Sequence, residues 1–223
     1  MWYFSPYLII QGASEHIISE SFIVFSCMLI FSIFFGRAWC GYLCPAGGLQ
    51  ECARQINESS IKTGWRKYIK FILWFIMLST VLILLVKGNK RIRVDFFYMT
   101  DHGVSVTEVF NYVIYYGVIL ILTLPALFSG RRGACYYICW MAPFMILGSK
   151  IGQKLHLPQL HMEYDTNQCI SCKQCNKACP MGLDVVSMVK HRDSGQIMDC
   201  IQCGECVEAC PKKVIKYKMK WEN

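Results

Sequence analysis

The most constraining feature of this chain is a cysteine run that occurs twice near its C-terminus. One copy begins at Cys169 and the other at Cys200, and each reads C-x2-C-x2-C-x3-C-P. Three thiolates two residues apart on one loop can reach three irons of a single [4Fe–4S] cubane. The surrounding segment of roughly 65 residues is too short to build a large hydrophobic core. Bound metal is therefore expected to contribute much of its folding free energy.

The fourth cysteine of each run decides how the ligands pair. In bacterial two-cluster ferredoxins, which carry this run, that cysteine ligates the other cluster. We therefore expect two [4Fe–4S] clusters with crossed ligand sets, the first held by Cys169, Cys172, Cys175 and Cys210 and the second by Cys200, Cys203, Cys206 and Cys179. Zinc is the alternative, although zinc sites usually combine two separate C-x2-C pairs. Disulfides are disfavoured because eight such thiols belong in a reducing compartment.

Upstream of these runs the chain is strongly apolar. Of all residues, 54% are hydrophobic and only 17% are charged. Three almost uncharged stretches, 17–35, 68–86 and 109–128, each approach the roughly 20 residues that a helix needs to cross about 30 Å of hydrocarbon. The alternative is three buried helices of a soluble protein. We expect a membrane α-helical module with three transmembrane helices over 1–155, followed by a small α+β two-cluster ferredoxin domain over 156–223.

Shorter elements are expected around the spans. Residues 45–58 form a surface helix that begins at Pro45, with an apolar face made by Leu49, Cys52, Ala53 and Ile56. Segment 141–155 has the composition of an interfacial segment, as has 1–12. In the tail, strands over 160–164 and 214–218 bracket the cysteine runs, and 181–190 is helical. The two cysteines outside all motifs, Cys27 and Cys52, are expected to be small buried apolar residues.

Two C-x3-C pairs follow the first and third spans. Cys40 and Cys44 lie in Gly-Arg-Ala-Trp-Cys-Gly-Tyr-Leu-Cys-Pro at 36–45, and Cys135 and Cys139 lie in a related run. Cysteines at i and i+4 share one helix face, and spans that run the same way bring both pairs to one membrane surface. We expect these four thiols to hold a third metal centre, most simply a [4Fe–4S] cluster. Zinc, free thiols and redox-active pairs are the alternatives.

The basic residues of the short loops predict the orientation. Six lie in 37–70 and four in 130–154, ten in all, against four in 87–108 and none in the first 20 residues. This bias places the N-terminus outside and the ferredoxin-like tail in the cytoplasm, at the cytoplasmic (inner) membrane. It also explains the formal charge of +8 without a nucleic-acid partner.

Other cofactors are judged from histidines and carboxylates. No haem is expected, because none of the five His lies within a predicted span. A quinone pocket is a candidate near the outer surface, where residues able to take protons gather, namely Glu15, His16, Glu20, Asp95, Asp101, His102 and Glu108. A simpler interpretation is that these residues are solvated residues of loops and helix ends.

The combination of motifs resembles the NapH/NosR-like family of membrane iron–sulfur (polyferredoxin) proteins. The resemblance rests on residues 36–45, on Cys-Pro-Met-Gly-Leu-Asp-Val at 179–185 and on the second cysteine run. It departs from that family at Trp140, which stands where a Pro is usual, and in lacking both an additional N-terminal span and a flavin-bearing outer domain. The resemblance implies a redox protein that passes electrons between the quinone pool, or a cytoplasmic donor, and a partner.

The leading functional hypothesis is a membrane-bound electron-transfer protein, a subunit of an oxidoreductase complex rather than a catalytic chain. Its partners would be other redox proteins, with quinone or a soluble ferredoxin as candidates and the lipid bilayer as its environment. The main alternative is an assembly or metal-reduction factor that matures another enzyme. A third hypothesis is an iron–sulfur redox sensor, but the chain has no recognisable output domain.

Overall fold

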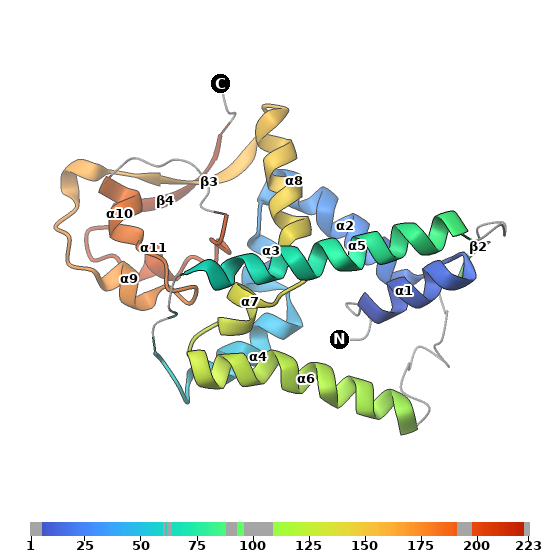
Figure 1. Ribbon diagram of the computed structural model, residues 1–223. Helices are drawn as coiled ribbons and strands as arrows, with labels where there is room; N and C mark the ends of the chain where they lie inside the picture. Colours follow the sequence, from blue (N-terminus) through green and yellow to red (C-terminus); the bar gives the residue numbers. More distant parts are fainter. Residues whose placement is uncertain are drawn as a thin grey trace.

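The computed structural model describes residues 6–59, 61, 64–87, 93–95, 109–190 and 198–220. Long helices occupy one part of the molecule, and a small domain of strands and short helices occupies the other (Figure 1). In chain order the elements are α1 Pro6–Glu15, β1 Ile17–Ile18, α2 Glu20–Phe35, α3 Ala38–Tyr42, α4 Pro45–Arg54, η2 Trp65–Tyr68, α5 Ile69–Lys87, β2 Arg93–Val94, α6 Val109–Ser129, α7 Gly133–Tyr137, α8 Ala142–Lys154, β3 Gln159–Tyr164, η3 Thr166–Gln168, α9 Gln174–Ala178, α10 Val185–Lys190, α11 Glu205–Glu208 and β4 Ile215–Lys220.

Helices α5 and α6 cover the second and third predicted spans. Both are long and apolar enough to cross a membrane. Their apolar side chains largely point away from the protein, as Val86 at 78% exposure and Phe128 at 82% illustrate. A core helix of a soluble protein would bury most of this surface, so these two helices are candidates for contact with lipid.

The first predicted span does not form as expected. Helix α2 begins at Glu20 and has 16 residues, about 24 Å at 1.5 Å per residue, so it is short for a bilayer. The preceding Ile17 and Ile18 form strand β1 and pair in parallel with Arg93 and Val94 of β2. Their backbone groups bond to another segment instead of continuing the helix. Three transmembrane helices are therefore not confirmed.

Helix α8 packs closely on α2, which corrects the prediction of an interfacial segment at 141–155. Gly148 allows this approach, because a Cβ there would lie 2.6 Å from the carbonyl oxygen of Leu29. Phe144 of α8 makes edge contacts with Phe25 of α2 at 5.3 Å and with Trp74 of α5 at 5.5 Å. These contacts join α2, α5 and α8 in one core.

Helix α4 begins at Pro45 as predicted but ends at Arg54, four residues earlier than expected, so Ile56 lies beyond it and is 79% exposed. Of the predicted apolar face, Ala53 is buried and Leu49 half-buried, whereas Cys52 is exposed and Gln50 is fully buried instead. Cys27 is also exposed, so the prediction that the two unpaired cysteines are buried is wrong. Gln50 is buried because its side chain contacts Cys135 of the second C-x3-C pair, as described below.

The C-terminal domain is organised by one strand pair. Strands β3 and β4 are antiparallel, with Gln159 opposite Lys220 and Tyr164 opposite Ile215, and they lie beside the short helices α9, α10 and α11 (Figure 1). Strand β3 begins one residue before the predicted segment, and β4 begins one residue after the predicted start and ends two residues beyond the predicted end. Helix α10 begins only at Val185, because residues before it form the turn that follows Cys179.

Candidate metal centres

The two cysteine runs of the C-terminal domain fold into loops of the same backbone shape. Ser171 and Gln202 occupy equivalent places in the runs and have φ values of 57° and 53°. Lys173 and Gly204, which follow the second cysteine of each run, have φ values of 60° and 86°. Left-handed non-glycine residues are uncommon and concentrate at functional loops. The repeated shape indicates that both loops are bent for the same purpose.

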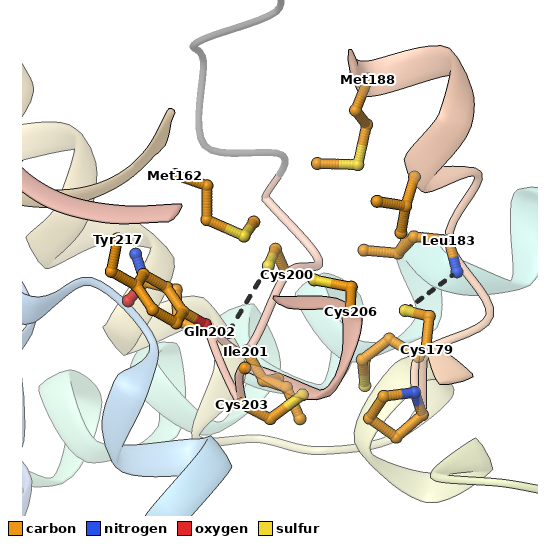
Figure 2. Close-up of a pocket in the computed structure, with 14 residues that line it drawn as sticks. Met162, Cys179, Leu183, Met188, Cys200, Ile201, Gln202, Cys203, Cys206 and Tyr217 are labelled. Carbon is orange, nitrogen blue, oxygen red and sulfur yellow. Dashed lines mark hydrogen bonds between the residues drawn. The ribbon is translucent and has the colours of Figure 1, made fainter. Parts of the chain in front are cut away.

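One hollow in this domain is lined by cysteines from both runs. Cys200, Cys203 and Cys206 line it from the second run and Cys179 from the first, and their sulfur atoms face a common space (Figure 2). Its volume, including space open to solvent, is about 360 Å³. The rest of the lining is mainly apolar, with Met162, Leu183, Met188, Ile201 and Tyr217 among its members. These four cysteines are one of the two crossed sets expected from the sequence.

Backbone amides point at two of these sulfur atoms. The N–H of Leu183 donates to Sγ of Cys179 at 3.4 Å, and the N–H of Gln202 donates to Sγ of Cys200 at 3.5 Å (Figure 2). Hydrogen bonds of this kind stabilise cluster thiolates and help set their reduction potential.

Burial raises the pKa of the thiols that line this hollow, so without metal they are weak acids. Desolvation, together with Cys179 and Cys203, raises the pKa of Cys200 to about 12. Desolvation, together with Cys200 and Cys203, likewise raises the pKa of Cys206 to about 12. At neutral pH these thiols hold their protons unless a metal cation stabilises the thiolates. The donor set therefore fits an iron–sulfur cluster, which binds thiolates.

The second hollow holds the other expected set. It is lined by Cys169, Cys172, Cys175 and Cys210 and has nearly the same volume, about 350 Å³. Burial is again the main cause that raises the pKa of Cys175, and Cys172 and Cys210 add to it. The crossed assignment of ligands stays a prediction, and the lining of the two hollows supports it.

The two C-x3-C pairs do not lie on continuous helices, contrary to the sequence expectation. Helix α3 carries Cys40 but ends at Tyr42, and Cys44 stands at the start of α4. The N–H groups of Leu43 and Cys44 both donate to the carbonyl of Trp39, at 2.9 and 3.0 Å. The second pair repeats this ending, because the N–H groups of Ile138 and Cys139 both donate to Ala134 at 3.0 Å. The two motifs are thus structural repeats even though neither forms one helix face.

The four cysteines of these pairs are brought together, with Cys40 and Cys135 buried and Cys44 and Cys139 half-buried. Burial raises the pKa of Cys139 to about 11, with further increases from Cys40 and Cys44. Burial also raises the pKa of Cys135 strongly, with contributions from the other three thiols. Gln50 fixes Cys135 from both ends, since its Nε2 donates to Sγ at 3.1 Å and its Oε1 accepts from the Cys135 N–H at 3.2 Å.

Buried cations surround this thiol group. Arg37, Lys70 and Arg132 are each at most 5% exposed and all interact electrostatically with its cysteines. Arg132 donates to the carbonyl of Cys40 at 2.9 Å and pairs with Glu51 at 3.0 Å. In the sequence, Arg37 and Arg132 stand three residues before Cys40 and Cys135. The sequence did not indicate Lys70, whose only signal was a basic residue within an apolar span.

A single metal ion and a cubane make different demands on the placing of cysteine sulfur atoms. Within the part of the chain that the structure describes, no three His, Cys, Asp or Glu side chains converge closely enough to share one ion. A zinc ion needs its thiolates within about 2.3 Å of one point. In a cubane each cysteine binds a different iron, so the sulfur atoms stand farther apart.

The ferredoxin-like domain docks on the C-x3-C pairs through the loops of the first hollow. Tyr42 donates to the carbonyl of Cys203 at 3.0 Å, and Arg131 donates to that of Cys179 at 2.6 Å. Arg54 pairs with Glu205 at 2.9 Å. Gly41 permits the close approach, because a Cβ there would lie 2.6 Å from the carbonyl of Ile201. None of these contacts across the interface was expected from the sequence.

Some of the candidate quinone residues lie near one another. His16 and Glu20 are both 4% exposed, and the N–H of Asp95 bonds to the carbonyl of Ile18 at 3.3 Å. Asp95 also lies within electrostatic range of Glu20. Glu15 is exposed at the end of α1. Asp101, His102 and Glu108 lie outside the described residues, so the pocket stays a prediction.

Comparisons with known proteins point to iron–sulfur chemistry in both parts of the chain. Residues 161–211 match a family model described as a 4Fe-4S dicluster domain. Residues 20–65, which contain Cys40 and Cys44, match a second family model described as a 4Fe-4S binding domain. No solved structure matches the chain.

A curated protein of Escherichia coli (strain K12), named "Putative electron transport protein YccM", is 20% identical over 201 residues, which cover 83% of this chain and 53% of that protein. The chain therefore spans about half the length of the curated relative. Neither family model nor this relative specifies the NapH/NosR-like family, so that membership stays a prediction. Both matched segments of the chain are thus similar to domains that bind 4Fe-4S clusters.

Proposed function

We propose that this chain is a membrane-bound protein that transfers electrons through [4Fe–4S] clusters. The observation that carries the proposal is the pair of similar hollows in the C-terminal domain, each lined by four cysteines from both runs. Cys169, Cys172, Cys175 and Cys210 would hold one cluster, and Cys200, Cys203, Cys206 and Cys179 the other. Such clusters supply one-electron exchange with little rearrangement. The protein contributes the thiolates, the N–H donors and a largely apolar enclosure.

A third centre at Cys40, Cys44, Cys135 and Cys139 is part of the proposal, and charge supports it. Three buried cations, Arg37, Lys70 and Arg132, face two carboxylates, Asp199 and Glu51. One positive charge is left over among these groups when the four thiols are protonated. A cluster bound by four thiolates is anionic, so its negative charge would offset this buried positive charge. Neutral thiols or a disulfide would leave the excess charge buried.

The membrane role follows from α5 and α6, whose exposed apolar side chains need a lipid-like environment. We place the N-terminus outside and the ferredoxin-like tail in the cytoplasm at the cytoplasmic membrane, as the loop charges favour. The third centre would then lie where the C-x3-C pairs meet the tail. Other redox protein subunits, a quinone or a soluble electron carrier would exchange electrons with the chain.

The test is anaerobic purification of the full chain from membranes, followed by iron analysis and redox titration. About eight irons per chain are expected if only the tail sites are loaded, and about twelve if the third centre is also present. Paramagnetic signals of reduced [4Fe–4S] clusters should appear on dithionite addition and disappear reversibly on oxidation. A chain that is folded in membranes but binds stoichiometric zinc, or no metal, would contradict the proposal.

A further inference from the structure

The two cysteine loops of the ferredoxin-like domain differ in how far they are exposed. The loop of Cys200 contacts the rest of the chain, for example through the bond from Tyr42 to Cys203, and Ile201 is only 2% exposed. In the loop of Cys169 the equivalent Ile170 is 60% exposed, and Cys172 is exposed. In Figure 1 the segment between β3 and α9, which enters this loop, lies at the edge of the molecule away from α5 and α6.

Lysines border the hollow of Cys169 on two sides. Lys173 and Lys212 line it directly, one from each cysteine run. Lys177 lies one turn after Lys173, and its N–H donates to the Lys173 carbonyl at 3.2 Å. Lys213 follows Lys212, and all four side chains are exposed. We call these four residues, Lys173, Lys177, Lys212 and Lys213, the lysine rim.

Nearby carboxylates offset only part of the charge of the lysine rim. Asp184 lies within electrostatic range of Lys173. Glu163 and Asp165 line a hollow together with Lys212, Lys213 and Lys216, and Glu163 pairs with Lys218 at 3.3 Å. Six lysines, the rim together with Lys216 and Lys218, against these three carboxylates leave a net positive surface beside the apolar Ile170.

We propose that the lysine rim is the docking surface for an acidic protein that carries one electron. This inference rests on the proposed function, because the docked protein would exchange electrons with the cluster proposed in the hollow of Cys169. A small apolar centre within a charged border suits transient redox complexes, in which complementary charge sets orientation and association rate. In each encounter one protein is oxidised by one electron as the other is reduced by one, and no bond forms or breaks.

The position of the lysine rim favours a soluble protein over an anionic lipid surface. The apolar faces that suit lipid belong to α5 and α6. The segment between β3 and α9, which leads into the lysine rim, lies at the edge of the molecule away from α5 and α6 (Figure 1). At physiological salt the charge of lipid headgroups acts over a Debye length of only about 8 Å, so a surface turned away from the apolar helices suits a soluble partner.

The experiment measures equilibrium binding of an acidic plant-type [2Fe–2S] ferredoxin, used as the probe, to the iron-loaded full chain in nanodiscs. Titrations at about 50 and 200 mM salt are compared for the native chain, for Lys173→Glu/Lys212→Glu and for Lys154→Glu. Lys154 is an exposed lysine at the end of α8 and serves as the control. We expect Kd to rise about tenfold with salt and at least tenfold in the double variant, with little change in the control.

Three outcomes would overturn the docking proposal. The first is a Kd for the ferredoxin that is the same in the native chain and in the double variant. The second is equally tight binding of a basic electron carrier such as cytochrome c. The third is that the double variant loses binding to anionic vesicles but keeps binding to the ferredoxin. Iron content and the dithionite-reduced signal are recorded on the same samples. Full iron and a normal signal without salt-dependent binding reject the docking surface alone. Absence of both iron and signal rejects the proposed function itself.

Discussion

Lys70, at the start of α5, donates a hydrogen bond to the carboxylate of Asp199, which immediately precedes Cys200. Lys70 is fully buried, and its ammonium group also lies 5.4 Å from the ring centre of Tyr136. Arg37 approaches the same carboxylate at 4.0 Å and bonds to the carbonyl of Met198 at 2.9 Å. This contact ties an apolar helix, a C-x3-C motif and a ferredoxin-like loop together.

Lys70→Met should therefore loosen the tail from the helical part. Removing Lys70 leaves the carboxylate of Asp199 with only Arg37, at 4.0 Å, and breaking a buried ion pair destabilises by up to about 3–5 kcal/mol. We expect faster proteolysis of the tail in intact nanodiscs and a lower Tm. Lys67→Met is the matched control, because Lys67 precedes α5, is only half-buried and contacts the exposed Tyr68. Equal proteolysis rates in both variants would show that the ion pair does not hold the domain.

Cys179→Ser tests the crossed ligand sets. Because Cys179 lines the hollow of the second run, its loss should damage the site of Cys200, Cys203 and Cys206 while the other site persists. Paramagnetic spectra of the reduced chain should lose or alter one signal, and iron should fall by at most four per chain. Cys210→Ser should affect the opposite signal. An uncrossed arrangement would produce the reverse pattern.

The double variant Cys40→Ala/Cys135→Ala tests the third centre. Removing one thiol from each pair should lower the iron content by about four per chain and leave the two tail signals in place. Cys27→Ala/Cys52→Ala is the control, because both cysteines are exposed and lie outside the motifs. If the chain holds eight irons before and after the change at Cys40 and Cys135, the third centre does not exist.

Labelling of lysines tests the orientation. Lys212 and Lys213 are exposed in the tail, and Lys87 is exposed at the other end of α5. A membrane-impermeant amine reagent applied to intact cells should label Lys87 and reach Lys212 and Lys213 only after lysis. Labelling of the tail before lysis would reverse the topology.

The pKa of Cys200 predicts how the metal-free chain responds to pH. Its folded value of about 12 lies above the usual value of about 8.5, so the unfolded chain loses this proton first. The metal-free fold should therefore lose stability as pH rises from about 8.5 to 12. Iodoacetamide at pH 8 should modify the exposed Cys52 much faster than Cys200, which peptide mass spectrometry would show. Equal rates would mean that the hollow opens without metal.

Local patterns predicted much of the chemistry and part of the fold. Spacing within each cysteine run predicted which thiols belong together, since a loop of few residues restricts where its side chains can reach. Uninterrupted apolar runs predicted α5 and α6 to within a few residues. Hydrophobic periodicity alone did not predict the structure at α2, α4 and the C-x3-C pairs. Pairing with strand β2 shortens α2, and the contacts of Gln50 change the buried face of α4. Breaks after Tyr42 and Tyr137 interrupt the helices of the C-x3-C pairs.

Contacts between distant segments depended on the tertiary structure alone. Arg37 and Met198, like Tyr42 and Cys203, are separated by 161 residues along the chain. No local periodicity connects such positions, and a buried lysine such as Lys70 has a partner only after the domain has docked. The sequence by itself thus determined which cysteines are expected as ligands and where the apolar helices lie, because both depend on short-range spacing. The tertiary structure decided that Cys203 lies against Tyr42 and that Ile170 is exposed where its equivalent Ile201 is buried, because both depend on how separate elements pack.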